Sequence, residues 1–87
     1  MYVDKYSEEI TRKLKKLKKK DFNHYKTIRK KMDWILENPG HRYKELRHKM
    51  QGLRRVHIGH FVLVFKIDDV NKTIYFQDYD HHDNIYR

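Results

Sequence analysis

The sequence contains no cysteine, one proline and three glycines among its 87 residues. Without cysteine the chain can form neither a disulfide framework nor a thiolate zinc site, and it has no thiol nucleophile. It also lacks any apolar run near the roughly 18–20 residues that span a bilayer, and it has no signal-peptide core. We therefore expect one intracellular domain over residues 1–87, located in the cytoplasm and not bound to a membrane.

Positive charge is abundant and unevenly distributed. Lysine and arginine number 21 against 12 acidic residues, a formal net charge of +9 with the seven histidines neutral. Residues 41–60 hold six basic side chains and one acidic one, whereas residues 67–87 hold five aspartates and two basic side chains. A small body this basic attracts polyanions, nucleic acid first and an acidic protein segment second. The lysines over residues 13–20 are by themselves typical of a solvated helix face.

The first half of the sequence predicts a helical hairpin. Ser7 and Asp21 each suit an N-cap ahead of an apolar stripe with helical spacing, and Asn38-Pro39-Gly40 should end the second helix. The stripes are Ile10, Leu14 and Leu17, followed by Phe22, Tyr25, Ile28, Met32, Ile35 and Leu36. We expect Tyr25, Ile28, Met32 and Ile35 to be mostly buried.

The second half predicts an antiparallel meander. Residues 53–58 alternate, which places Arg55 and His57 on one face of a strand, and Gly59-His60 can form a tight turn. Residues 61–67 are apolar on both faces, as in a central strand, and residues 73–79 form a third strand. A short strand over residues 1–3 and one helical turn within the basic connection 41–52 are further candidates.

These elements predict an α+β fold. An N-terminal helical hairpin should pack on a small antiparallel sheet of three to four strands, with Phe61, Leu63 and Phe65 toward the helices.

Three stretches of sequence carry a family resemblance. Met50-Gln51-Gly52-Leu53 precedes the first meander strand, Arg55-Val56-His57-Ile58-Gly59-His60-Phe61 and Val62-Leu63-Val64-Phe65 run through its turn, and His81-His82-Asp83-Asn84-Ile85-Tyr86 closes the chain. In this order and spacing they resemble the RelE/ParE toxin superfamily. The resemblance implies a RelE-like domain and the toxin role of a type II toxin–antitoxin system. Members of the RelE branch cleave messenger RNA, many of them in the ribosomal A site, while an antitoxin that wraps around them holds them inactive. Members of the ParE branch inhibit DNA gyrase.

The residues present can support RNA cleavage without a metal. Attack of a ribose 2′-hydroxyl on the adjacent phosphate needs a base, an acid and a cation, and histidine and arginine supply these near neutral pH. The resemblance implies His82 as general base or acid, Arg55 as phosphate clamp, and Tyr86 as base-stacking or proton-donating partner. His57 is a second acid–base candidate. Asp80 or Asp83 could orient an imidazole.

Each of these residues also has a purely structural interpretation. His57 can be a strand-surface histidine without a role, and residues 81–82 can belong to a polar C-terminal loop. Tyr86 can simply dock the end of the chain on the core.

Further basic side chains are candidates for binding RNA: Lys44, Arg47, Lys49, Arg54, His60 and His81. We expect no cofactor. A metal site built from His57, His60, His81, His82 and Asp80 is chemically conceivable. Neither a helical two-histidine spacing nor a cysteine pair supports it, so we predict no metal.

Two positions depart from the family pattern. Val62 and Asp80 stand where many members carry arginine, so a ParE-like gyrase inhibitor and a catalytically degenerate RNA- or antitoxin-binding member stay open. A stand-alone basic RNA-binding module would explain the charge but not the His82–Tyr86 ending. The expected partners are a cognate antitoxin, messenger RNA and the ribosome. The antitoxin should cover the basic surface and an apolar strip formed by Val62 and Val64.

Overall fold

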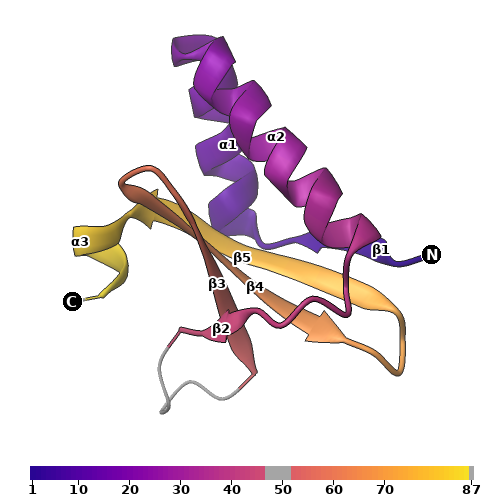
Figure 1. Cartoon of the computed structure of the whole chain (residues 1–87). Coiled ribbons are helices and arrows are strands. Elements are labelled where there is room, and N and C mark those ends of the chain that lie inside the picture. The colour runs from indigo at the N-terminus through magenta and orange to yellow at the C-terminus, as the bar shows by residue number, and fades with distance from the viewer. Residues whose placement is uncertain (47–51, 87) are drawn as a thin grey trace.

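The computed structural model describes residues 1–46 and 52–86. Two long helices pack on one face of a twisted sheet, and a one-turn helix follows the last strand (Figure 1). In chain order the elements are β1 (Val3–Tyr6), α1 (Glu8–Lys20), α2 (Phe22–Glu37), β2 (Lys44–Glu45), β3 (Leu53–Ile58), β4 (Phe61–Asp68), β5 (Thr73–His81) and α3 (His82–Ile85). The α+β fold with a helical hairpin is therefore confirmed.

Side-chain caps set the limits of the hairpin. Ser7 Oγ accepts the backbone N–H of Ile10 at 3.1 Å, and Asp21 Oδ1 accepts that of His24 at 3.1 Å. Both bonds satisfy amides that a helix start leaves without an intrahelical partner. Only Asp21 separates α1 from α2, which forces the two helices into an antiparallel pair. The predicted caps and the stop after Glu37 are confirmed.

The sheet has five strands in the order β1-β5-β4-β3-β2. Strands β3, β4 and β5 form the predicted antiparallel meander. Strand β2 pairs antiparallel with β3, and β1 pairs parallel to β5. The two additional strands lie at the edges, and β2 spans only Lys44–Glu45. The first strand begins at Val3 and not at Met1. Within residues 41–46 of the basic connection the structure has this short strand and no helical turn.

The main core lies between the helices and the sheet. Leu63 and Phe65 of β4 are fully buried against Ile28, Met32 and Ile35 of α2, as expected. Phe61 packs partly buried at the edge of this core, and Tyr25 is half-buried. Side chains alternate between the two faces of β3. Val56 and Ile58 therefore join the core, and Arg55 and His57 face away from the helices.

A second, smaller core covers the opposite face of the sheet. Val62 is 0% exposed and Val64 is 3% exposed, in one cluster with Leu46. Ile85 and Tyr86 pack on this cluster from the C-terminal end, together with Leu53. The prediction that Val62 and Val64 form an apolar strip for the antitoxin to cover is therefore wrong, because the C-terminal segment already covers these residues.

Among the residues that the structure describes, α2 is the longest helix, with 16 residues. In the described ranges 1–46 and 52–86, the helices are all too short or too polar to cross a membrane.

Candidate functional site

Arg55, His57 and Tyr86 form a cluster on the face of the sheet that lies away from the helix pair. Arg55 and His57 are two residues apart on β3, so their side chains project from the same face. Tyr86 follows α3, which turns the chain back over the sheet. Three of the four predicted catalytic residues thus meet at one place, although they lie up to 31 positions apart in the sequence.

The distances inside this cluster are those of direct contact. Arg55 Nη1 lies 2.9 Å from His57 Nε2, and the Tyr86 hydroxyl lies 3.5 Å from the same nitrogen. The Tyr86 ring stacks on the His57 ring with centroids 6.3 Å apart, and the Arg55 guanidinium lies 5.9 Å from the Tyr86 centroid. Arg55 Nε also donates to the backbone carbonyl of Glu45 at 3.0 Å, a second contact that holds the side chain over β2.

The chemistry of this contact assigns the proton on His57. A guanidinium has only donors, so Nε2 of His57 must be the acceptor in its bond with Arg55. The imidazole is then neutral with its proton on Nδ1, and this tautomer is inferred from the bonding pattern. A neutral imidazole beside a fixed cation can accept a proton next to a bound phosphate.

His82 makes its contacts in a different cluster. Its ring lies 4.4 Å from that of His81 and 6.3 Å from that of His60, and its Nδ1 lies 3.1 Å from Asp83 Oδ1. It connects to Tyr86 through the backbone, because the Tyr86 N–H donates to the His82 carbonyl at 3.0 Å. Asp83 is thus the carboxylate beside the histidines, and within residues 1–46 and 52–86 the side chains of His81, His82 and Asp83 lie close enough together to hold a metal ion.

Asp80 has a structural role that the sequence did not indicate. Its carboxylate accepts hydrogen bonds from Lys13 Nζ at 2.9 Å and from Asn84 Nδ2 at 2.9 Å. Partial burial tends to raise the pKa of Asp80, but the hydrogen bonds from Asn84, Lys13 and the His81 backbone amide outweigh it and hold this pKa at about 2. Asp80 therefore ties α1 to α3 and is not placed to orient an imidazole.

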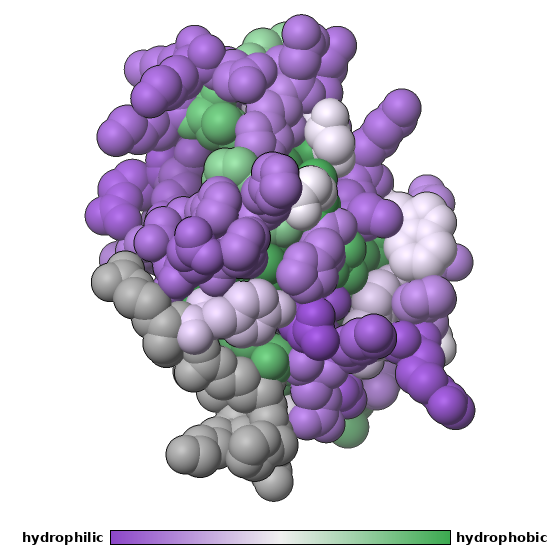
Figure 2. All heavy atoms as spheres, turned by 60° about the vertical axis from the view of Figure 1, so that its left-hand side comes forward, coloured by the Kyte–Doolittle hydropathy of each residue, from purple (hydrophilic) through white to green (hydrophobic). Residues whose placement is uncertain are grey.

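The expected RNA-binding residues are spread over two regions. Lys44 is exposed and pairs in register with Arg55, while Arg54 forms an ion pair with Glu45 at 3.3 Å. His60 and His81 belong to the histidine cluster. Two further candidates, Arg47 and Lys49, lie outside the described residues, as does part of the motif before β3. The surface around α3 is mostly hydrophilic, with apolar atoms visible only between polar side chains (Figure 2).

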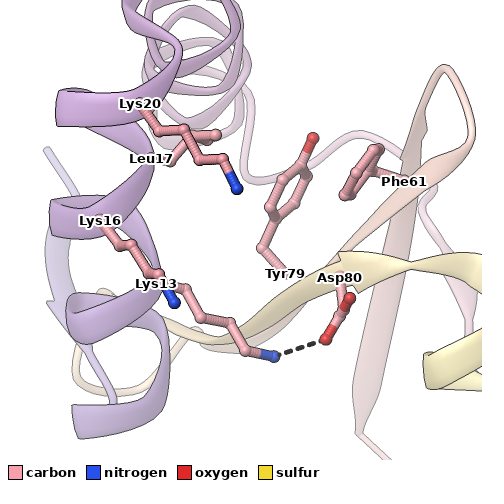
Figure 3. A pocket seen from close by; sticks show the side chains of 7 residues that line it. All are labelled: Lys13, Lys16, Leu17, Lys20, Phe61, Tyr79 and Asp80. Atoms are coloured by element: carbon pink, nitrogen blue, oxygen red, sulfur yellow. Dashed lines mark hydrogen bonds and ion pairs between the residues drawn. The ribbon is translucent and has the colours of Figure 1, made fainter.

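A lysine-rich pocket between α1 and the sheet was not predicted. Lys13, Lys16 and Lys20 extend from one face of α1 toward the strand residues Phe61 and Tyr79 (Figure 3). Leu17 and Asp80 complete its lining, and its volume is about 370 Å³. The expectation of a solvated helix face thus fails at Lys13, which pairs with Asp78 at 2.7 Å as well as with Asp80. Lys13, Lys16 and Lys20 follow the spacing i, i+3, i+7, which places them on one face of the helix, and this spacing was the sequence pattern that could have indicated the pocket.

Comparison with known proteins identifies the family. A Methanocaldococcus jannaschii protein named "Putative toxin RelE4" is 49% identical over 88 residues, which cover 100% of this chain and 93% of that protein. The isolated E. coli RelE toxin has the same fold with a TM-score of 0.78 at 18% identity, over 93% of this chain and 84% of that one. A chain of the RelBE2 toxin–antitoxin complex from Mycobacterium tuberculosis has a TM-score of 0.76 at 22% identity, over 92% of this chain and 96% of that one. The family model of the ParE toxin of type II toxin–antitoxin systems matches residues 5–86. The chain therefore belongs to this toxin family and has the RelE-like fold.

Proposed function

We propose that this toxin is a metal-independent endoribonuclease that cleaves messenger RNA. The observation that carries the proposal is the contact of Arg55, His57 and Tyr86 on the sheet face away from the helix pair, where the His57 side chain is exposed. His57 would take the proton from the 2′-hydroxyl, since its Nε2 is an acceptor. Arg55 would turn from His57 to the phosphate and stabilise the charge that develops there. Tyr86 would stack on a splayed base or donate a proton to the leaving oxygen.

His82 supplies a second proton-transfer group one helical turn before Tyr86. Because its ring lies with His60 and His81, it would act from the side of the β3–β4 turn and not through Arg55. The pair of histidines matches the need of RNA cleavage for one base and one acid.

Cleavage of messenger RNA tests the proposal, with and without translating ribosomes and in EDTA. We expect His57→Ala and His82→Ala each to lower the rate about 10²–10⁴-fold, the usual contribution of one acid or base. His41→Ala is the matched control, since His41 packs on Trp34 and Tyr43 and belongs to neither cluster. If His57→Ala and His82→Ala cleave RNA as fast as the wild type does, the proposed catalytic site is wrong.

A ParE-like inhibitor without nuclease activity is the second candidate. It is favoured by Val62 and Asp80, the two positions where RelE-like relatives are expected to carry arginine. Val62 is buried and Asp80 is bonded to Lys13 and Asn84, so neither site offers a cation to RNA. Two results together would establish this alternative. The chain would arrest growth without cleaving RNA, with or without ribosomes, and it would abolish supercoiling by gyrase.

We further propose that a cognate antitoxin binds the lysine-rich pocket. The RelBE2 structure is that of a toxin–antitoxin complex, and the pocket here joins an apolar floor to cationic walls. An acidic amphipathic segment fits both features. The double variant Lys16→Glu/Lys20→Glu should weaken antitoxin binding at least about tenfold. The control Lys30→Glu/Lys31→Glu on α2 should not, and equal effects of both pairs would place the antitoxin elsewhere.

A further inference from the structure

Three imidazoles and a carboxylate gather where the β3–β4 turn meets α3. His60 lies in the turn, His81 ends β5, and His82 and Asp83 begin α3. The ring centroids of His81 and His82 are 4.4 Å apart, and that of His60 lies 6.1 Å from His81 and 6.3 Å from His82. The proposed RNA chemistry uses only one of these four residues as an acid or base.

The backbone holds this cluster together independently of its side chains. The His82 N–H donates to the His60 carbonyl at 2.9 Å, and β4 pairs with β5 up to the register Phe61–His81. The turn and the start of α3 therefore keep a fixed separation. Ligands held on such ordered elements lose little entropy when they bind an ion.

The spacing of His81, His82 and Asp83 is close to that of three ligands of a tetrahedral metal site. The ligand atoms of His81, His82 and Asp83 all lie within 4.8 Å of one another. His82 Nδ1 lies 3.1 Å from Asp83 Oδ1, and His81 Nδ1 lies 3.5 Å from Asp83 Oδ2. Ligands about 2.0–2.1 Å from a tetrahedral zinc ion are about 3.3 Å apart, between these two values.

We propose that His81, His82 and Asp83 form a zinc site, with His60 turning in from the exposed β3–β4 turn as the fourth ligand. Imidazole nitrogens and one carboxylate oxygen are ligands that Zn²⁺ accepts, and three histidines favour zinc over magnesium or calcium. His81 Nδ1 also accepts the Asp83 backbone N–H at 3.2 Å, and the metal bond replaces this long contact. All four side chains are partly or fully exposed, so the ion has direct access from solvent.

The ion would join the β3–β4 turn to α3 by a bond through side chains. Since α3 leads directly into Tyr86, zinc would fix the segment that carries this residue. It would also occupy the imidazole of His82. The site itself does not depend on the proposed nuclease activity, because binding is measured without RNA.

Titration of the untagged chain with Co²⁺ and with Zn²⁺ tests the site. We expect one equivalent of Co²⁺ to give the intense visible absorption of a tetrahedral ion, and Zn²⁺ to displace it. Zn²⁺ should also raise the melting temperature, because it binds the folded chain in preference to the unfolded one. His60→Ala and His82→Ala should each weaken binding by about tenfold or more, since even outer-shell substitutions often cost ~10–100-fold.

His41→Ala is the control, because this exposed histidine contacts Trp34 and lies outside the cluster. It should leave the Zn²⁺ affinity unchanged. Circular dichroism of each variant separates lost ligands from lost fold. Equal affinities in the wild type and in the folded triple variant His60→Ala/His81→Ala/His82→Ala would overturn the proposal, as would an octahedral Co²⁺ spectrum.

Discussion

Nη1 of Arg55 lies 2.9 Å from Nε2 of His57, on the same face of one strand. An arginine that donates to a neutral histidine keeps that histidine in the form that can act as a base. The same bond blocks the basic nitrogen until the guanidinium turns away. A phosphate that draws Arg55 toward itself would therefore free His57 at the moment RNA binds.

Replacement of Arg55 separates these two effects. Arg55→Ala should lower RNA cleavage about 10²–10³-fold, as expected for one preorganised charge stabiliser, with little change in stability because the side chain is only partly buried and its hydrogen bonds lie at the surface. Arg55→Lys should recover only part of the rate, since lysine cannot bind phosphate in a planar fork. Single-turnover cleavage measures both variants. Arg12→Ala, which removes an arginine that is 70% exposed on α1, is the control, and an equal loss there would make the effect one of net charge.

Substitution at Tyr86 distinguishes stacking from proton donation. Tyr86→Phe keeps the ring over His57 and loses the hydroxyl, so a rate within about threefold of wild type means stacking and a loss of ~10²-fold or more means donation. Tyr86→Ala should in addition lower the melting temperature, because Tyr86 packs on the cluster of Val62 and Val64. Cleavage rates and thermal unfolding of the two variants decide between these roles.

The Lys13–Asp80 pair predicts a loss of stability in acid. The pKa of Asp80 is held at about 2, below its ordinary value of 3.8, so this carboxylate stabilises the fold above about pH 4 and the contribution disappears as the pH falls toward 2. Asp80→Asn should lower the free energy of unfolding by about 1 kcal/mol at pH 7 and by less at pH 3. Urea unfolding at the two pH values measures this.

Asp33→Asn is the matched control for Asp80→Asn. Asp33 forms an exposed i,i+4 ion pair with Arg29 at 3.5 Å, and its side chain is 63% exposed. Such pairs contribute about 0.5 kcal/mol or less. If Asp33→Asn lowers the free energy of unfolding as much as Asp80→Asn does, the Lys13–Asp80 pair contributes no more to stability than an exposed ion pair.

Local patterns were sufficient to predict α1, α2, β3, β4 and β5 and part of the site. Caps at Ser7 and Asp21 fix helix starts through bonds within three residues, and strand alternation alone places Arg55 beside His57. The parallel pairing of β1 with β5 joins residues about 70 positions apart, and no local pattern encodes it. The same holds for the bond between Lys13 and Asp80, which are 67 residues apart.

The C-terminal segment shows a different limit of sequence reasoning. Val62 and Val64 alternate with core residues on a central strand, and the pattern alone does not tell whether their face is open or covered. Ile85 and Tyr86 cover it because the chain turns at α3, and a four-residue helix with one apolar residue carries almost no periodic signal. For the same reason the histidine cluster could not be separated from the Arg55 site.

The burial of Val62 predicts that the arginine expected here from the family resemblance cannot be introduced at this position. Val62 is 0% exposed beneath Ile85 and Tyr86, so Val62→Arg must bury a charge or displace the C-terminal segment. We expect the free energy of unfolding to fall by about 2–4 kcal/mol, with RNA cleavage reduced because Tyr86 moves. Val70→Arg introduces the same charge at a residue that is 91% exposed and should change neither quantity. A Val62→Arg variant as stable as wild type and faster in cleavage would mean that the C-terminal cover opens readily and that Val62 lies in the active site.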